Sequence, residues 1–488
     1  MDRKVDFQEH KGEKMDGLTQ EERQELLAAG APLKSVNDFQ KALRAFNLPP
    51  RPTREKMKAD TSKAQGIYRA GVKLLGVWPA KLERDAAQAR AADIVKGMLR
   101  NTRNAFAHTY VELIFSRITN GYRRFIRAED LVYEAGELCP GLCPTREEVE
   151  SESRLALAEK EGVEIAQSDF LAHVFSNRLA GLYLIHSMLQ PLPQSQELLE
   201  KFQRYGRLSL GTAQVERRGP LGCVFYSNLR YLNAEDDTTV LPLEIATDLV
   251  LLDSRVEVGL LRGNFVDHPK YQGRRVFSAG LNLTHLYHGK ISMMFYLTRD
   301  LGFVNKLYRG LAGTTFDPEG PEVTLEKLWI AALEAFAIGG GCQVLLVLDY
   351  VIAEEGSYFN LPARKEGIIP GVSPMRFSRF VGERTAQQGI LFDSTFPVSS
   401  PEARGIVNEV VPAAQMDEAI ERIVAKVSGA GLISAGANRK AIRIGQESRD
   451  QFRQYMALYC REQANCHFSP VLIGNLERNW NAKNRRLG

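Results

Sequence analysis

The sequence predicts an α/β core that follows a long helical segment and is itself followed by helices. Three observations across the 488 residues support this order. Apolar residues before about residue 212 recur at three- and four-residue steps, as amphipathic helices require. From residue 213, short β-type runs alternate with helical patterns, which is typical of βαβ units and a mainly parallel sheet. From Met416 the helical period returns.

A chain of this length exceeds one ordinary hydrophobic core, so we expect two or three domains. Residues 1–65 are charged and contain three prolines between positions 48 and 52, which favours a flexible, partly disordered lead-in. We then expect an N-terminal all-helical domain over 66–212, an α/β core over 213–415 and a C-terminal helical oligomerisation region over 416–488.

Composition excludes several classes of protein. Hydrophobic residues at 44% and charged residues at 25% are typical of a globular protein, and the net charge of +4 does not favour nucleic acid as a partner. The polar first residues contain no apolar h-region, so we expect no signal peptide, and no apolar run approaches the length of a membrane span. Six cysteines in a chain this long do not make a disulfide framework, so we expect the protein to be located in the cytosol.

The helical segment contains one pair of cysteines at short spacing. Cys139 and Cys143 each precede a proline, which allows either a zinc site or a proline-stiffened loop. The later Cys460, Cys466 and His467 do not supply a second ligand pair at a recognised spacing. We therefore predict no metal.

The core is predicted from strands at 222–226, 256–261 and 276–277, with an amphipathic helix over 241–252 between the first two. Two glycine-containing turns follow apolar runs. One holds Gly339, Gly340 and Gly341 before Gln343, and the other holds Ala279 and Gly280 before Leu281. Such turns are either tight packing turns or sites where backbone N–H groups face a ligand oxygen. Together, the N–H groups of Leu281 and Gly340 could hold one oxyanion.

A basic loop lies just before the turn that holds Ala279 and Gly280. His268, Lys270 and Tyr271 are followed by two arginines, which suits a nucleotide phosphate or an ordinary solvated loop.

Five motifs in order resemble the crotonase (enoyl-CoA hydratase/isomerase) superfamily. They are NLRYLNA at 228–234, FSAGLNL at 277–283, GGGCQ at 339–343, EGIIPG at 366–371 and ARGIVNEVV at 403–411. The resemblance implies a spiral of ββα units, a trimer or hexamer, and acyl-CoA as ligand. It places the thioester carbonyl between the N–H groups of Leu281 and Gly340. We expect substrate or CoA contacts from the following residues, which lie in the basic loop and in the matched motifs: Arg230, His268, Lys270, Tyr271, Ala279, Gly280, Asn282 and Gly339.

The sequence departs from the hydratases of this family at both catalytic carboxylates. Gln343 and Ala363 stand where those enzymes carry glutamates. An amide is no carboxylate base and alanine has no proton chemistry, so hydration by the two-glutamate route is disfavoured. Gln343 can still orient a substrate hydroxyl.

The long helical segment together with Gln343 resembles one branch, the cofactor-independent 3,5-dihydroxyphenylacetyl-CoA 1,2-dioxygenases. The resemblance assigns the ring hydroxyls to Glu235 and Gln343 and a further role to Arg299, with Arg309 as the alternative. It implies that an enolate reacts with O2 without metal or flavin to give an aryl α-keto acid and CoA, in glycopeptide antibiotic biosynthesis.

Two other functions remain open. One is another crotonase-type enzyme (thioesterase, isomerase or hydratase) with an unrecognised carboxylate. The other is a non-catalytic acyl-CoA-binding protein. The residue that takes the Cα proton is not identified, although His285 and His288 lie near the turn that holds Gly280.

Overall fold

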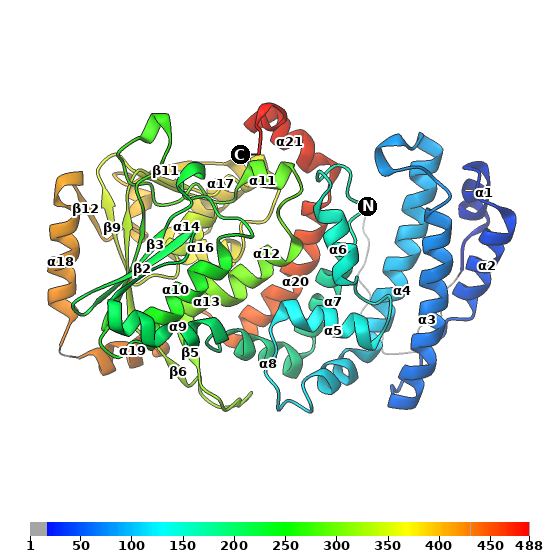
Figure 1. The fold of residues 1–488 in the computed structure, drawn as a ribbon, viewed down its shortest axis with the longest axis horizontal. Helices are drawn as coiled ribbons and strands as arrows, with labels where there is room; N and C mark the ends of the chain where they lie inside the picture. Colours follow the sequence, from blue (N-terminus) through cyan, green and yellow to red (C-terminus); the bar gives the residue numbers. More distant parts are fainter. Residues whose placement is uncertain (1–16, 430, 488) are drawn as a thin grey trace. The chain divides into compact units, whose positions relative to one another are not determined.

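The structure is a computed structural model that describes residues 17–429 and 431–487. The chain divides into two compact units, one ending at Gly181 and the other beginning at Leu182. Helix α8 (Arg178–Met188) carries the chain from one unit to the next (Figure 1). The division lies earlier than the boundary expected at 212, so that α9 (Pro193–Tyr205) belongs to the second unit.

The first unit is helical. Its helices are α1 (Gln20–Ala28), α2 (Leu33–Arg44), α3 (Arg54–Leu75), α4 (Ala86–Ile118), α5 (Ala128–Leu138), α6 (Arg146–Ser153) and α7 (Ile165–Ser176), with a short 3-10 turn η1 (Lys81–Glu83). Side-chain caps define several starts. The Thr19, Asp85 and Thr145 side chains each accept from the third backbone N–H of their helix, and the side chain at that position binds back.

The expectation of a disordered lead-in over 1–65 is wrong for the part that the structure describes. Residues 17–65 contribute α1, α2 and the first half of α3. Val36, Phe39 and Leu43 of α2 are fully buried at helical spacing, whereas the charged residues occupy the other face. The prolines between 48 and 52 separate two helices rather than marking disorder. Residues 1–16 lie outside the described residues.

The second unit is built on a seven-stranded sheet with the order β1-β2-β3-β4-β7-β9-β12. Its strands are β1 (Arg207–Ser209), β2 (Ala213–Arg218), β3 (Leu221–Tyr226), β4 (Val258–Gly263), β7 (Leu328–Leu333), β9 (Tyr350–Glu354) and β12 (Glu409–Val411). From β3 to β12 all neighbours are parallel, and β1 and β2 add an antiparallel edge. The predicted parallel core is confirmed.

Helices cover both faces of this sheet. On one face α18 (Met416–Val427) packs Met416, Ile420 and Ile423 against side chains of β3, β4, β7 and β9. On the other face α10 (Val240–Leu252) contributes most to the larger core cluster (Figure 1). Strands buried on both sides explain why β3, and β4 up to Leu261, are continuous apolar runs in the sequence.

A smaller sheet lies beside the glycine turns. It has the order β11-β10-β8, formed by Thr395–Pro397, Tyr358–Asn360 and Phe336–Ile338. The strand expected at 276–277 is not one, because this segment makes single bridging hydrogen bonds instead, such as Phe277 N to Glu334 O. A third pairing joins β5 (Leu311–Ala312) and β6 (Thr324–Leu325).

The remaining helices of the second unit connect these layers. They are α11 (Leu283–Tyr287), α12 (Met293–Thr298), α13 (Asn305–Arg309), α14 (Gly340–Leu345), α15 (Ala363–Glu366), α16 (Ser373–Val381), α17 (Glu383–Phe392), α19 (Leu432–Gln446), α20 (Arg449–His467) and α21 (Pro470–Trp480). Shorter turns are η2 (Leu229–Tyr231), η3 (Pro269–Tyr271), η5 (Pro401–Gly405), η6 (Ala413–Gln415) and η7 (Ala482–Asn484). A π-helical segment, η4 (Arg299–Val304), joins α12 to α13.

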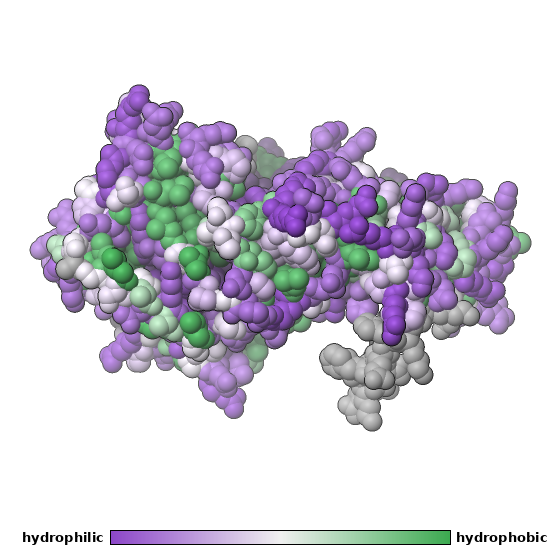
Figure 2. All heavy atoms as spheres, turned by 90° about the horizontal axis from the view of Figure 1, so that it is seen from below, coloured by the Kyte–Doolittle hydropathy of each residue, from purple (hydrophilic) through white to green (hydrophobic). Residues whose placement is uncertain are grey.

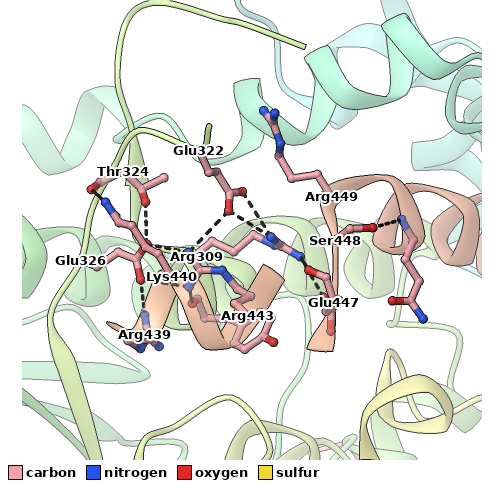
Figure 3. Close-up of polar contacts among 12 residues, drawn as sticks. Arg309, Glu322, Thr324, Glu326, Arg439, Lys440, Arg443, Glu447, Ser448 and Arg449 are labelled. Atoms are coloured by element: carbon pink, nitrogen blue, oxygen red, sulfur yellow. Dashed lines mark hydrogen bonds and ion pairs between the residues drawn. The ribbon is translucent and has the colours of Figure 1, made fainter. Parts of the chain in front are cut away.

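A buried ion-pair network attaches α19 and the turn into α20 to the core (Figure 3). Arg443 binds Glu326 at 2.6 Å, and Arg309 binds both Glu322 and Glu447. The Glu447 carboxylate also accepts two hydrogen bonds of 2.8 Å from Arg376. Because these charges are withdrawn from water, each one depends on its partners. The C-terminal helices are therefore fixed by charge as well as by apolar packing.

Candidate active site

The candidate site is a small buried cavity of about 30 Å³ in the second unit. Residues from the two glycine turns, from the junction of α12 and η4, and from the segment after β10 line it. Those that carry polar groups are Glu235, Tyr296, Arg299, Asp300, Gln343, Glu366 and Tyr459. The cavity therefore gathers polar groups that lie more than 200 residues apart in the sequence.

The two glycine turns lie next to each other through backbone hydrogen bonds. Ser278 N donates to Phe336 O at 3.3 Å, and Ile338 N donates to Ser278 O at 3.0 Å. On the other side of the Gly280 turn, Glu235 N donates to Gly280 O at 2.7 Å. These parallel bridges bring Glu235, the Gly280 turn and the Gly340 turn side by side.

Two glycines are needed for this close approach. A Cβ on Gly280 would lie 2.5 Å from Ile338 O, and its φ of +76° also disfavours a side chain. A Cβ on Gly340 would lie 2.7 Å from Glu235 Oε2. Glycine is therefore required at both positions by contact with the opposite side of the site.

Most backbone N–H groups of the turns are already bound. Ala279 N donates to Leu232 O, Gly280 N to Ser278 Oγ, and Gly339 N to Asn360 O, at 2.9–3.1 Å. The N–H groups of Leu281 and Gly340 have no acceptor among the described residues, and both residues line the cavity. Unbound donors in a buried site are available to an anionic oxygen.

One side of the cavity, the polar wall, is formed by Glu235, Arg299, Asp300 and Gln343, and Arg299 lies at its centre. Its Nε and Nη2 both bind the Glu235 carboxylate, and Nη1 donates to Gln343 Oε1 at 2.8 Å. Nη2 also donates to Gly340 O at 2.9 Å. Burial opposes the charge of Arg299, but Glu235 and Asp300 outweigh it and raise the pKa of the guanidinium. The sequence-predicted residues Glu235, Arg299 and Gln343 are thus brought together.

The local backbone explains where Arg299 sits. Ser292 caps α12, since its Oγ accepts from Phe295 N at 3.0 Å. The helix then widens into the π-helical η4, which begins at Arg299. π-helical segments inside helices often occur at functional sites. The alternative assignment, Arg309, lies in the ion-pair network with Glu322 and Glu447 and does not line the cavity (Figure 3).

Glu366 is the residue that sequence reasoning missed. It belongs to the quoted EGIIPG motif, but only the structure places its side chain on the cavity. The residue is 3% exposed, and its carboxyl forms no hydrogen bond or ion pair with the described residues. Burial, and then the charge of Asp393, raise the pKa of Glu366 to about 8. One signal was available, a glutamate within an otherwise apolar motif next to Pro370.

Of the residues expected to contact CoA, Gly339 lines the cavity, and Ala279 and Gly280 lie in the adjoining turn. The four with charged or aromatic side chains lie outside the lining, on two loops. Arg230 is on η2, and His268, Lys270 and Tyr271 are on η3 or next to it. Asp267 N donates to Leu229 O at 3.1 Å, so the two loops are joined.

Three further candidate residues have structural partners. The side chain of Asn282 binds Asp236 at 2.9 Å and caps α11 through His285 N. The His285 ring also pairs with Asp236, at 3.1 Å, and His288 binds Arg485 O at 2.8 Å. Neither histidine lines the cavity.

Over 17–429 and 431–487, no three His, Cys, Asp or Glu side chains gather as metal ligands would. Over the same ranges no helix combines the length and the apolar character that crossing a bilayer requires.

Parallel-stranded turns that leave two backbone N–H groups open to a buried pocket are typical of enzymes that stabilise an oxyanion. Similarity to known proteins identifies the family of enzymes to which this site corresponds. Residues 272–457 match the family described as enoyl-CoA hydratase/isomerase. A (3,5-dihydroxyphenyl)acetyl-CoA 1,2-dioxygenase from Amycolatopsis orientalis is 40% identical over 83% of this chain and 92% of its own length. The chain belongs to the enoyl-CoA hydratase/isomerase (crotonase) family.

More distant relatives are hydratases. A short-chain-enoyl-CoA hydratase from Clostridium acetobutylicum is 26% identical over 49% of this chain and 84% of its own length. Among solved structures, an enoyl-CoA hydratase from Mycobacterium avium subsp. paratuberculosis K-10 aligns with a TM-score of 0.44 and 18% identity, over 57% of this chain and all of that one.

Proposed function

We propose that this protein is a cofactor-independent dioxygenase that converts (3,5-dihydroxyphenyl)acetyl-CoA and O2 into 3,5-dihydroxyphenylglyoxylate and CoA. The observation that carries the proposal is the buried Arg299, which holds both Glu235 and Gln343 beside the Gly340 turn. This arrangement offers polar groups to ring hydroxyls within reach of an oxyanion site. The 40% identity to the Amycolatopsis dioxygenase over most of both chains supports the substrate and the reaction.

The first step is formation of an enolate. An arylacetyl thioester has an acidic Cα–H, because the ring and the thioester both delocalise the carbanion. The N–H groups of Leu281 and Gly340 would hold the thioester oxygen, which gains negative charge as the proton leaves. Each such donor contributes about 3–4 kcal/mol in enzymes where one has been removed. The cavity is buried, so water does not compete for these donors.

The ring is oriented by the polar wall. Glu235 can accept a hydrogen bond from one ring hydroxyl, and the amide of Gln343 can donate to another. Arg299 keeps both side chains in place, because it binds a carboxylate oxygen of one and the amide oxygen of the other. A fixed ring plane lets the enolate conjugate with the aromatic system throughout the reaction.

The enolate then reduces O2 by one electron, and the radical pair combines to a peroxide at Cα. The distal peroxide oxygen attacks the thioester carbonyl and expels the CoA thiolate. Cleavage of the O–O bond with loss of the second Cα hydrogen gives the α-keto acid. One substrate and one O2 thus give one keto acid and one CoA, and no external reductant is required.

We further propose that the CoA portion binds along the joined loops that carry Arg230, His268 and Lys270. Positive side chains at the surface suit the phosphates of CoA. The six cysteines are free thiols, which supports the cytosol as the compartment.

A homo-oligomer, trimer or hexamer, is also part of the proposal. Apolar side chains are exposed on the C-terminal half of the chain, among them Phe392 at 72%, Ile433 at 93% and Ile444 at 76%. The surface view in Figure 2 shows apolar patches within a mainly hydrophilic surface. Burial of such patches between subunits would remove apolar area from water.

The test is O2 consumption by metal-free protein given (3,5-dihydroxyphenyl)acetyl-CoA, with EDTA present and free thiol followed in parallel. We expect O2 uptake and CoA release in equal amounts. Thiol release without O2 uptake would indicate a thioesterase and contradict the proposal.

One observation favours a rival within the same family. Glu366 gives the cavity a carboxyl that can move protons, as a hydratase or isomerase needs. Turnover of enoyl-CoA esters under anaerobic conditions would support that rival. Tight acyl-CoA binding with no turnover under either condition would instead support a binding protein.

A further inference from the structure

The reaction requires a group that accepts the Cα proton, and the cavity contains several acidic side chains. Glu235 accepts from Arg299 through both carboxylate oxygens and from Tyr226 Oη at 3.0 Å. Asp300 accepts from Arg299 Nη1 at 2.9 Å. Burial raises the pKa of Asp300, but a carboxylate oxygen that accepts a hydrogen bond from a fixed guanidinium has that lone pair directed away from the substrate. These two side chains are therefore committed to the polar wall.

Glu366 differs from them in its surroundings. It is the last residue of α15, its backbone is held by a hydrogen bond of 2.9 Å from its N–H to Pro362 O, and its side chain faces the cavity. Among the described residues nothing donates to its carboxyl oxygens. A buried carboxyl without a partner is costly in free energy, so its presence calls for a ligand or a reaction.

The position of this carboxyl relates directly to the oxyanion site. A Cβ built on Gly339 would lie 3.7 and 3.8 Å from the two carboxyl oxygens of Glu366. Gly339 immediately precedes Gly340, whose N–H is open to the cavity, and Leu281 lines the same cavity. Because Cα is one bond from the thioester carbonyl carbon, a carbonyl held at these donors brings Cα into the neighbourhood of Glu366.

We propose that Glu366 is the base that removes the Cα proton, a catalytic role that rests on the proposed function. The Cα–H bond breaks, the proton moves to a carboxylate oxygen of Glu366, and the electron pair passes into the thioester, whose oxygen the two backbone N–H groups hold. The chain thus replaces both hydratase glutamates, lost at Gln343 and Ala363, with one carboxyl at a different position.

The electrostatic surroundings suit a base for a weakly acidic C–H bond. Burial and then Asp393 raise the pKa of Glu366 to about 8, which makes its ionised form a stronger base than an exposed glutamate. Asp393 itself is bound by Arg364 and by Lys365 N, so its charge is fixed in place.

Two variants test the assignment. Glu366→Gln keeps the shape of the side chain and removes the base, and Glu366→Ala leaves room for a small carboxylate from solution. We expect O2 uptake with (3,5-dihydroxyphenyl)acetyl-CoA to fall about 10²- to 10⁴-fold in both, with the affinity for the substrate unchanged. Added formate should restore part of the activity of Glu366→Ala and none of that of Glu366→Gln. Glu355→Gln, at an exposed position, is the control.

The outcomes separate this proposal from the function itself. Wild-type O2 uptake establishes the dioxygenase whatever the variants do. O2 uptake in Glu366→Gln within about threefold of wild type would overturn the role of Glu366. Loss of substrate binding together with turnover would also overturn it, and so would the absence of formate rescue. Either result would indicate that Glu366 has a structural role and is not the base. A wild type that neither takes up O2 nor releases CoA would refute the proposed function, and the role of Glu366 with it.

Discussion

Arg299 Nη1 donates a hydrogen bond of 2.8 Å to Gln343 Oε1. Since the arginine binds the amide oxygen, the amide N–H₂ of Gln343 is turned away from it and is free to donate elsewhere in the cavity. A glutamate at this position would present only acceptors and would pair fully with the guanidinium. The amide therefore gives the site a hydrogen-bond donor that a hydratase carboxylate cannot supply.

This relationship predicts a selective loss. Gln343→Ala and Glu235→Gln should lower kcat/KM on the dihydroxylated substrate more than on unsubstituted phenylacetyl-CoA, because only the hydroxyls use these groups. The expected difference is about 1–3 kcal/mol, or roughly 5- to 150-fold. Steady-state O2 uptake with both thioesters measures it. Equal losses on the two substrates would reject the ring-orienting role.

A second prediction concerns the close approach at Gly340. Gly340→Ala places a Cβ 2.7 Å from Glu235 Oε2 and 3.1 Å from Arg299 Nη2, so the polar wall must shift. We expect loss of most of the activity, at least about 10²-fold, since a small displacement of catalytic groups already costs this much. Gly340→Pro removes the N–H outright and should abolish turnover.

Gly436→Ala is the matched control for this substitution. A Cβ at that position of α19 meets nothing within 4 Å, so activity should stay at the wild-type level. Full activity in Gly340→Ala would show that the close contact is not needed.

The sequence was sufficient for the class of fold because local patterns and the five motifs agree. The parallel strands and the helices at both ends follow from patterns that can be read in order, whereas the grouping of Glu235, Arg299 and Gln343 was implied by the family resemblance. Glu366 could not be identified in this way. Its role depends on burial and on the absence of a partner, which are properties of the packed structure rather than of the motif.

For the first helices, the composition of the sequence was itself misleading. Charged residues and prolines indicated disorder over 1–65, yet one apolar face was enough to fold α2. A helix needs only three or four apolar positions in two turns, and a high average charge on the other face conceals them. The ion-pair network around Glu447 was equally hidden, because its members come from four separate segments.

A third prediction tests whether the described part of this segment is packed. Phe39→Ala removes a fully buried ring from α2 and should cost about 3–5 kcal/mol of unfolding free energy in the first unit. Limited trypsin digestion of the native protein should then release fragments ending within residues 17–75 much faster than in wild type. Leu33→Ala, at a position 56% exposed, should digest like wild type. Equal digestion of Phe39→Ala and wild type would support the original expectation of disorder.

A fourth prediction concerns pH. Burial alone would oppose ionisation of Glu447, but Arg376, Arg309 and Arg379 outweigh it and hold its pKa at about 2. In the unfolded chain this carboxyl titrates near 4.5, so between these values the unfolded state binds more protons than the folded state. The ion pairs therefore contribute fully above about pH 4.5, and their contribution is lost as pH falls toward 2. The size of this contribution is about 3 kcal/mol.

Glu447→Gln should be less stable than wild type by about 3–5 kcal/mol at pH 7, because two buried guanidinium groups and a half-buried one lose this counter-charge. Below pH 4.5 the difference should shrink steadily, since wild type loses the same charge by protonation. Urea unfolding at several pH values between 2.5 and 7 measures this difference. Glu421→Gln, an exposed change on α18, should follow the wild-type curve throughout. A gap between wild type and Glu447→Gln that does not change with pH would mean that the side chain stabilises α19 and α20 by packing and not by its charge.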